Sequence, residues 1–221
     1  MKCEKSRSML SGRSIRKPNH RWKFLDSSMP DWTAQLPEQQ AAPVYLEDES
    51  IQVNITPETF EELDATATAE AQQLGSLHGS IENGDGNYAG IFGELVFQRV
   101  LGGRRDNTYE YDIFYNNTRI DVKTKRRTVP PKPGYMCSIA SYNTEQQCDI
   151  YYFISVLDDY SAVWLLGYLD TPTFYEKAKF CKKGDYEPSN GYVYKADCWD
   201  LPHAALKTSE KGQQLPDLIS I

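Results

Sequence analysis

The amino-acid sequence predicts an α/β protein in which helices flank a mixed central β-sheet. Two segments, "DIYYFISVL" (149–157) and "SAVWLLGYL" (161–169), are apolar, β-branched and aromatic, as buried neighbouring strands are. Helical patterns precede and follow these strands, so the expected order is helix, three or four strands, helix, strand. The 221 residues suffice for one sizeable domain with extensions.

The first 50 residues predict an extension rather than a packed domain. Residues 1–23 are basic, with eight Lys or Arg and one acid. A Pro-rich, acidic stretch without sustained periodicity follows them, which favours a mobile arm. We expect a single domain over residues 51–207, with its core at about 87–200, and a tail over 208–221.

The charges and the cysteines limit the partners and the cellular compartment that we expect for this chain. The net charge of −7 argues only weakly against a nucleic-acid partner, because the charges are segregated. Residues 24–98 hold fourteen acids and no Lys or Arg, whereas residues 99–132 hold nine Lys or Arg and four acids. The five widely spaced cysteines favour reduced thiols in the cytoplasm, which would be the host cytoplasm if the chain is viral. No apolar run approaches the roughly 20 residues that a membrane span needs.

Two helices are expected before the sheet. Thr56 is suited to cap a helix over 57–74, which has Pro57 in its first turn. A second helix is expected over "YAGIFGELVFQRVL" (88–101), with Asn87 as its N-cap and Gly102 beyond its end.

Shorter elements complete the expected order. "IQVNI" (51–55) and "GYVYKADC" (191–198) predict strands, "TPTFYEKAKF" (171–180) predicts a helix, "LPHAAL" (201–206) predicts a short helix, and "CSIASYN" (137–143) fits a strand or a loop.

A hairpin over residues 111–126 has its turn at Asn116-Asn117, because Asn tolerates the left-handed conformation of two-residue turns. This turn pairs position 113 with 120 and 112 with 121, and alternation sorts the side chains onto two faces. The core face would carry Tyr111, Ile113, Tyr115, Ile120 and Val122, and the opposite, charged face Glu110, Asp112, Phe114, Arg119, Asp121, Lys123 and Lys125.

The predicted opposition of Asp112 and Asp121 is the unusual feature of this hairpin. Directly opposed like charges weaken a strand pair. At 4 Å the repulsion is about 1 kcal/mol in water and about 4 kcal/mol at an effective dielectric of 20. A divalent cation removes this cost, since two carboxylates and water suit Mg²⁺. The alternative is a solvated strand face on which Lys123 pairs with Glu110.

Glu94 is the third acid of interest, because its helix is apolar on most sides and a desolvated carboxylate is costly. Gly90 and Gly93 beside it would let another backbone or a ligand approach closely. The alternative interpretation puts Glu94 on a narrow solvent stripe with Gln98.

Together these residues resemble the PD-(D/E)XK nucleases, also called restriction-endonuclease-like. That family has a Glu on the first core helix, an Asp late in one strand, and Asp/Glu-x-Lys on the next. Here "GELVF", "YDIF" and "IDVKTK" supply Glu94, Asp112 and Asp121-Val122-Lys123 in that order. Tyr111 stands where the family often has Pro. The resemblance covers about residues 87–200 and an αβββαβ core, and is closest to small phage-type or junction-resolving endonucleases.

The resemblance implies a Mg²⁺- or Mn²⁺-dependent nuclease that hydrolyses DNA phosphodiester bonds, as an endonuclease that leaves 5′-phosphate and 3′-hydroxyl ends. Asp112, Asp121 and the Val122 carbonyl would hold the metal, and Glu94 would contact it through water or help to hold a second ion. Lys123 would orient or deprotonate the attacking water, with a pKa that burial lowers and neighbouring carboxylates keep in check.

DNA is the expected partner, no membrane is expected, and homodimerisation is left open. Candidate phosphate contacts, which could equally be ordinary solubility charges, are Lys125, Arg126, Arg127, Lys132, Arg104 and Arg105. Gln146 and Gln147 are polar candidates without an assigned role. Two other classes stay open: a non-catalytic nucleic-acid-binding protein that retains the nuclease fold, and an acidic scaffold that binds protein through its N-terminal region.

Overall fold

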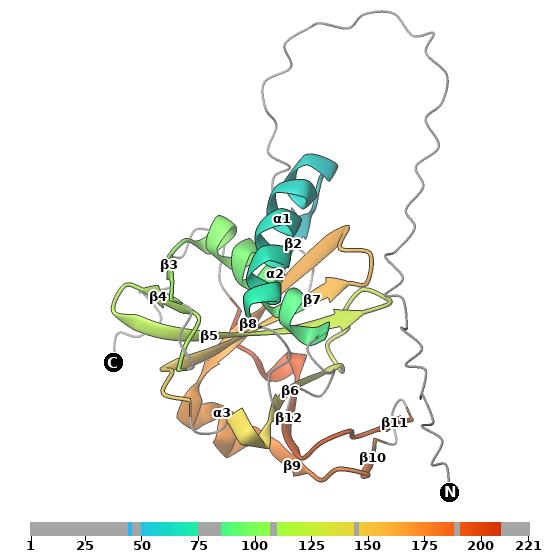
Figure 1. Cartoon of the computed structure of the whole chain (residues 1–221). Helices are drawn as coiled ribbons and strands as arrows, with labels where there is room; N and C mark the ends of the chain where they lie inside the picture. Colours follow the sequence, from blue (N-terminus) through green and yellow to red (C-terminus); the bar gives the residue numbers. More distant parts are fainter. Residues whose placement is uncertain are drawn as a thin grey trace, which may run out of the picture. The chain divides into compact units, whose positions relative to one another are not determined.

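A seven-stranded mixed sheet lies at the centre of the computed structural model, which describes residues 44–45, 50–74, 85–106, 110–143, 146–187 and 191–208 (Figure 1). In order across the sheet, the strands are β1 (Val44–Tyr45), β2 (Ile51–Asn54), β8 (Ala162–Asp170), β7 (Ile150–Leu157), β5 (Thr118–Arg127), β4 (Ile113–Tyr115) and β3 (Arg104–Arg105). Only β5 and β7 pair in parallel among these strands. The predicted mixed sheet is therefore confirmed.

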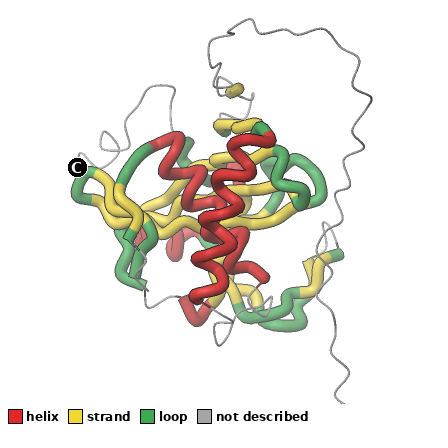
Figure 2. The backbone as a smooth tube through the Cα atoms, turned by 45° about the horizontal axis from the view of Figure 1, so that its top comes forward, coloured by secondary structure: helices red, strands yellow, loops and turns green. Residues whose placement is uncertain are grey.

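Two long helices cover one face of this sheet (Figure 2). They are α1 (Pro57–Leu74) and α2 (Asp85–Leu101). The central strands are apolar along their length because both faces of the sheet are covered. In β7, Tyr152 and Ile154 pack under the helices, while Tyr151 and Phe153 pack on the opposite side. The site described below is built around β5, which α2 crosses on this face.

The opposite face is covered by α3 (Thr171–Lys177) and by a three-stranded sheet (Figure 1). That sheet consists of β6 (Met136–Ala140), β12 (Cys198–Pro202) and β9 (Lys179–Cys181), and the short hairpin of β10 (Tyr186–Glu187) and β11 (Tyr192–Val193) follows β9 along the chain. Short 3₁₀ turns span Ser141–Asn143 and His203–Ala205. The strand after α3 thus pairs outside the central sheet, and the more specific restriction-endonuclease-like core stays a prediction.

The helix predictions are confirmed for α1 and wrong in part for α2. Thr56 accepts the Thr59 N–H at 3.3 Å and caps α1 as expected. Asn87 is not the N-cap of α2, which begins two residues earlier at Asp85. Its first turn is held by Tyr88, whose hydroxyl donates to Asp64 at 2.6 Å and whose ring stacks on Phe92. Tertiary contacts thus extend the helix into a Gly/Asn segment of low helix propensity.

The predicted boundaries near the C-terminus also required correction. The helix over 171–180 ends at Lys177, because Lys179–Cys181 pair with β12 instead. The single strand expected over 191–198 is split into β11 and the start of β12. The expected short helix over 201–206 is the 3₁₀ turn at His203–Ala205.

The predicted extension is shorter than 50 residues, because β1 pairs with β2 and so belongs to the sheet. The basic segment 1–23 and the tail after residue 208 lie outside the described residues. Four of the five cysteines are described, and all four are buried and free: Cys137, Cys148, Cys181 and Cys198. Among the described helices, none has the length and apolar character that a membrane crossing requires.

Candidate active site

The β4–β5 hairpin has the predicted turn but not the predicted opposition of acids. Asn116 and Asn117 have φ values of 44° and 63°, and Ile113 pairs with Ile120 as expected. Beyond this pair the register changes, because the Asp112 N–H donates to the Ile120 carbonyl at 3.0 Å. Asp112 is therefore not directly opposite Asp121, and that prediction is wrong.

Asp112 instead takes the place of a strand partner. Asp112 directly precedes β4, and its carboxylate accepts the Val122 backbone N–H at 2.7 Å. The N–H and C=O of one strand residue point to the same side, so the Val122 carbonyl lies on the side of the Asp112 carboxylate. Tyr111 packs in the cluster under α3 rather than on the predicted face.

Asp121 and Lys123 form a buried ion pair on the α3 face of β5. The Lys123 ammonium lies 2.5 Å from Asp121 Oδ2, and the two side chains are 18% and 2% exposed. Gln146 joins them, since its amide donates to Asp121 Oδ1 at 3.3 Å and its carbonyl accepts from Lys123 at 3.0 Å. The alternative pairing of Lys123 with Glu110 is not what the structure shows. Sequence reasoning assigned Gln146 no role, because only the fold brings it beside Asp121.

Glu94 reaches the site because α2 and β5 approach closely at Gly93. A Cβ on Gly93 would lie 2.0 Å from Thr124 Oγ1, so glycine is required there. A Cβ on Gly90 would meet nothing within 4 Å, so the expectation of close approach is confirmed for Gly93 only. Glu94 itself is 9% exposed, which rules out the solvent stripe.

Arg105 neutralises Glu94. Its guanidinium lies 2.7 Å from Glu94 and also contacts both oxygens of Glu70 on α1, at 2.9 and 2.8 Å. Burial raises the pKa of Glu94, although the hydrogen bond and charge of Arg105 partly offset this effect. The Arg105 guanidinium thus binds two carboxylates of this chain, whereas the sequence suggested it as a candidate contact to phosphate.

The acids influence one another's protonation. Burial, together with the charges of Asp121 and Glu94, holds the pKa of Asp112 well above its ordinary value. The pKa of Lys123 is raised, not lowered as expected: burial disfavours the ammonium, but the charges of Asp121 and Asp112 outweigh that effect. Without a bound metal Lys123 is therefore a cation, and the predicted lowered pKa is wrong.

The residues of this site have part of the charge and part of the oxygen ligands that a divalent cation needs. Asp112, Asp121 and the Val122 carbonyl offer the oxygen ligands that Mg²⁺ prefers. Burial first, and then the charges of Asp121 and Glu94, raise the pKa of Asp112, and a bound cation would oppose both effects. Within the described residues, no three His, Cys, Asp or Glu side chains form a ready cage. The arrangement fits a cation that keeps several waters, with Lys123 displaced from Asp121 Oδ2.

The predicted phosphate contacts differ in accessibility. Lys125 and Arg126 are exposed, and the Lys125 ammonium contacts the Ser138 hydroxyl at 3.3 Å. Arg127 is held by Ser155 at 3.0 Å and by the Met136 carbonyl at 3.1 Å, and burial lowers its pKa. The other two candidates, Arg104 and Lys132, are exposed, and Arg104 pairs with Asp106 at 2.9 Å.

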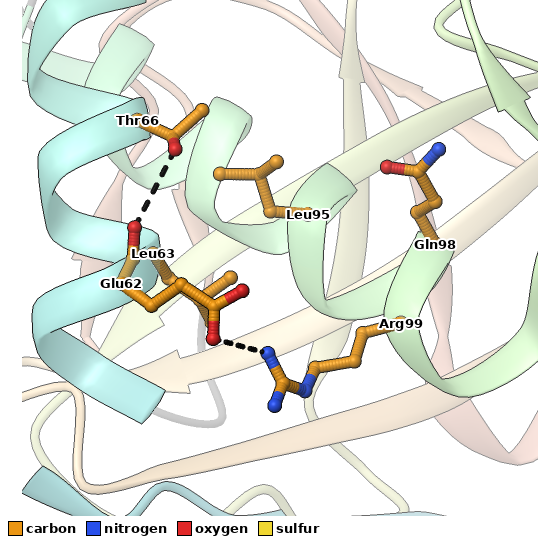
Figure 3. Close-up of a pocket in the computed structure, with 6 residues that line it drawn as sticks. All are labelled: Glu62, Leu63, Thr66, Leu95, Gln98 and Arg99. Carbon is orange, nitrogen blue, oxygen red and sulfur yellow. Dashed lines mark hydrogen bonds and ion pairs between the residues drawn. The ribbon is translucent and has the colours of Figure 1, made fainter. Parts of the chain in front are cut away.

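A pocket of about 290 Å³ lies elsewhere, between α1 and α2 (Figure 3). Glu62 and Arg99 form an ion pair across it at 2.8 Å, and the Thr66 hydroxyl donates to the Glu62 carbonyl. Its lining residues are Glu62, Leu63, Thr66, Leu95, Gln98 and Arg99, none of which belongs to the predicted site.

No protein-family model matches this sequence, and no curated protein matches it significantly.

Proposed function

We propose that this protein is a divalent-metal-dependent nuclease that hydrolyses DNA phosphodiester bonds. The observation that carries the proposal is that Glu94, Asp112 and Asp121 lie close enough for their charges to act on one another, with the Lys123 ammonium paired to Asp121. These acids come from α2, from the residue before β4 and from β5, and acids with perturbed pKa values are often found together at functional sites.

Asp112, Asp121 and the Val122 carbonyl would hold Mg²⁺ or Mn²⁺, with Glu94 acting through water. When bound, the ion would supply charge stabilisation for the phosphate oxygens and the leaving 3′ oxygen.

Lys123 then positions the attacking water or the phosphate as an ammonium, consistent with its raised pKa. Gln146 fixes the positions of the Lys123 and Asp121 side chains, since it forms a hydrogen bond with each of them. Arg105 limits the repulsion that Glu94 exerts on the other acids. The products would carry 5′-phosphate and 3′-hydroxyl ends, as the resemblance implies.

One observation favours a second candidate, a non-catalytic nucleic-acid-binding protein that retains this fold. Asp121 already has Lys123 as its counter-charge, and Glu94 has Arg105, so two of the three acids are neutralised without a metal. Such pairs could serve stability alone. Asp112, whose pKa burial and the two other acids raise, still favours the nuclease.

The test is incubation of the purified chain with supercoiled, linear, single-stranded and four-way-junction DNA, in Mg²⁺, Mn²⁺ or EDTA. We expect cleavage of at least one DNA form with either metal and none with EDTA. Binding without cleavage of any form would favour the second candidate.

A further inference from the structure

A chain of hydrogen bonds connects Tyr194, the residue after β11, to Lys125 on β5. The Tyr194 hydroxyl donates to the Asp200 carboxylate, and the Ser138 hydroxyl donates to the other Asp200 oxygen at 2.5 Å. The Lys125 ammonium contacts Ser138 at 3.3 Å. Asp200 is 3% exposed and Tyr194 5% exposed, so these groups form a fixed support. None of them has a role in the proposed hydrolysis.

This support holds an exposed aromatic ring next to a cation. The Tyr192 ring packs edge-on against Tyr194, with centroids 5.4 Å apart and an angle of 83° between the planes. The Lys125 ammonium lies 6.0 Å from the centroid of the Tyr192 ring. Tyr192 is nevertheless 42% exposed. A ring that is held by its neighbours and is also largely exposed can stack on a ligand at little entropic cost.

The ring lies close to the candidate active site. Lys125 is two residues after Lys123 on β5, on the same face and roughly 7 Å farther along the strand. A DNA strand with one phosphate at Asp121 and Lys123 would therefore have only a short distance to cover to Tyr192.

The surrounding segment has the charge that suits a polyanion. Residues 177–195 contain five lysines and two acids, in a chain whose net charge is −7. The lysines are Lys177, Lys179, Lys182, Lys183 and Lys195, and all are exposed. Lysines interleaved with exposed aromatic rings are typical of surfaces that bind single-stranded nucleic acid.

We propose that Tyr192 and Lys125 form a stacking platform for single-stranded DNA, in which the ring takes an unpaired base and the ammonium takes a neighbouring phosphate. Bases within a duplex are already stacked and do not offer a free face to such a ring. Its role next to the cleaved bond rests on the proposed nuclease function and names the substrate class: DNA with an unpaired segment beside the scissile phosphate.

The experiment is fluorescence anisotropy with a labelled oligo-dT strand and the full chain in EDTA, so that nothing is cleaved. Tyr192→Ala should weaken binding about 5- to 100-fold, as removal of one base–aromatic stack does. Tyr192→Phe, which keeps the ring, should bind like wild type.

Tyr186→Ala is the matched control. Tyr186 is 63% exposed on the same hairpin, but it is adjacent to the Glu187–Tyr192 pair and so points to the opposite face. Its removal should leave affinity unchanged. Far-UV circular dichroism and melting temperature would confirm that each variant is folded.

Unchanged affinity of Tyr192→Ala for oligo-dT would overturn the proposal, as would equal losses for single-stranded and duplex DNA. Tighter binding of oligo-U than of oligo-dT would overturn the assignment to DNA. The binding test and the cleavage test can fail independently. Unchanged oligo-dT affinity in Tyr192→Ala, together with metal-dependent cleavage by the wild type, refutes only the stacking platform. Single-strand binding through Tyr192 without any cleavage refutes only the nuclease.

Discussion

The Asp112 carboxylate makes a favourable hydrogen bond but lies where its negative charge is disfavoured. It accepts the Val122 N–H just before β4 begins, yet burial and the charges of Asp121 and Glu94 raise its pKa. An Asn at this position keeps an acceptor for the N–H and removes the charge. Asp112→Asn should therefore be more stable than wild type in EDTA by roughly 0.5–2 kcal/mol, and inactive. Thermal melts in EDTA and across a Mg²⁺ series at fixed ionic strength would measure this.

Mg²⁺ should narrow or reverse this difference, because only the wild type gains binding free energy from the ion. Asp158→Asn is a suitable control, since Asp158 is an exposed acid just beyond the far end of β7. If Asp112→Asn were less stable in EDTA, the charged carboxylate would serve the fold.

The pH dependence of stability has a definite sign at Asp112. Its pKa is about 3.9 in the unfolded chain and higher in the folded protein, so the folded state binds more protons between the two values. The stability of the metal-free wild type should fall as pH rises through this window. The advantage of Asp112→Asn should grow with pH over the same window, as measured by melts at a series of pH values.

Lys123 should matter for hydrolysis far more than for binding. Lys123→Ala should reduce cleavage at saturating DNA by at least about 100-fold, because a positioned group in the reaction is lost. The slope of log affinity against log salt should change by only about one unit. Lys123→Arg is a second variant, used in case Lys123→Ala does not fold, because it keeps a cation beside Asp121. Turnover of Lys123→Ala comparable to wild type would remove Lys123 from the site.

At the scale of elements, the close approach of α2 to β5 determines where Glu94 lies. Gly93→Ala would bring a methyl group into Thr124, whose three side-chain atoms lie 2.0–3.0 Å from it, so rotation of Thr124 gives little relief. We expect a loss of about 1–3 kcal/mol from overpacking. Gly90→Ala, in the same helix, should instead stabilise by about 0.5–1 kcal/mol, because space is open there. Urea unfolding of both variants tests this pair.

Thr124→Ala in the Gly93→Ala background should restore part of the loss, since it removes the nearest atom. Equal stabilisation by both glycine substitutions would show that α2 does not pack against β5 at this distance.

The sequence correctly predicted those elements whose structure depends on local residues alone. The Asn116-Asn117 turn, the Thr56 cap and the apolar strands β7 and β8 follow from backbone preference and burial pattern. The ends of α2 and α3 were mispredicted because remote contacts set them: Tyr88 with Asp64, and β9 with β12. The role of Gln146 and the Glu94–Arg105 pair were not predicted for the same reason, since neither has a local signature.

At the scale of the whole molecule, the segregation of charge is the feature most relevant to a DNA partner. The first 23 residues hold eight Lys or Arg, and residues 24–98 hold none. Deletion of residues 1–23 should flatten the dependence of log affinity on log salt, because fewer counterions are released. Cleavage at saturating DNA should be retained. An unchanged slope would mean that this segment does not contact the DNA backbone.

The central claim is that Glu94, Asp112, Asp121 and Lys123 form a metal-dependent hydrolytic site, and metal-dependent cleavage by matched variants tests it most directly. Wild type, Asp121→Asn, Lys123→Ala and the control Asp158→Asn would be purified identically and assayed on the same DNA in Mg²⁺ and in EDTA. We expect Mg²⁺-dependent cleavage, with 5′-phosphate ends, by wild type and Asp158→Asn alone. Equal cleavage by all four proteins, or by wild type in EDTA, would contradict the account.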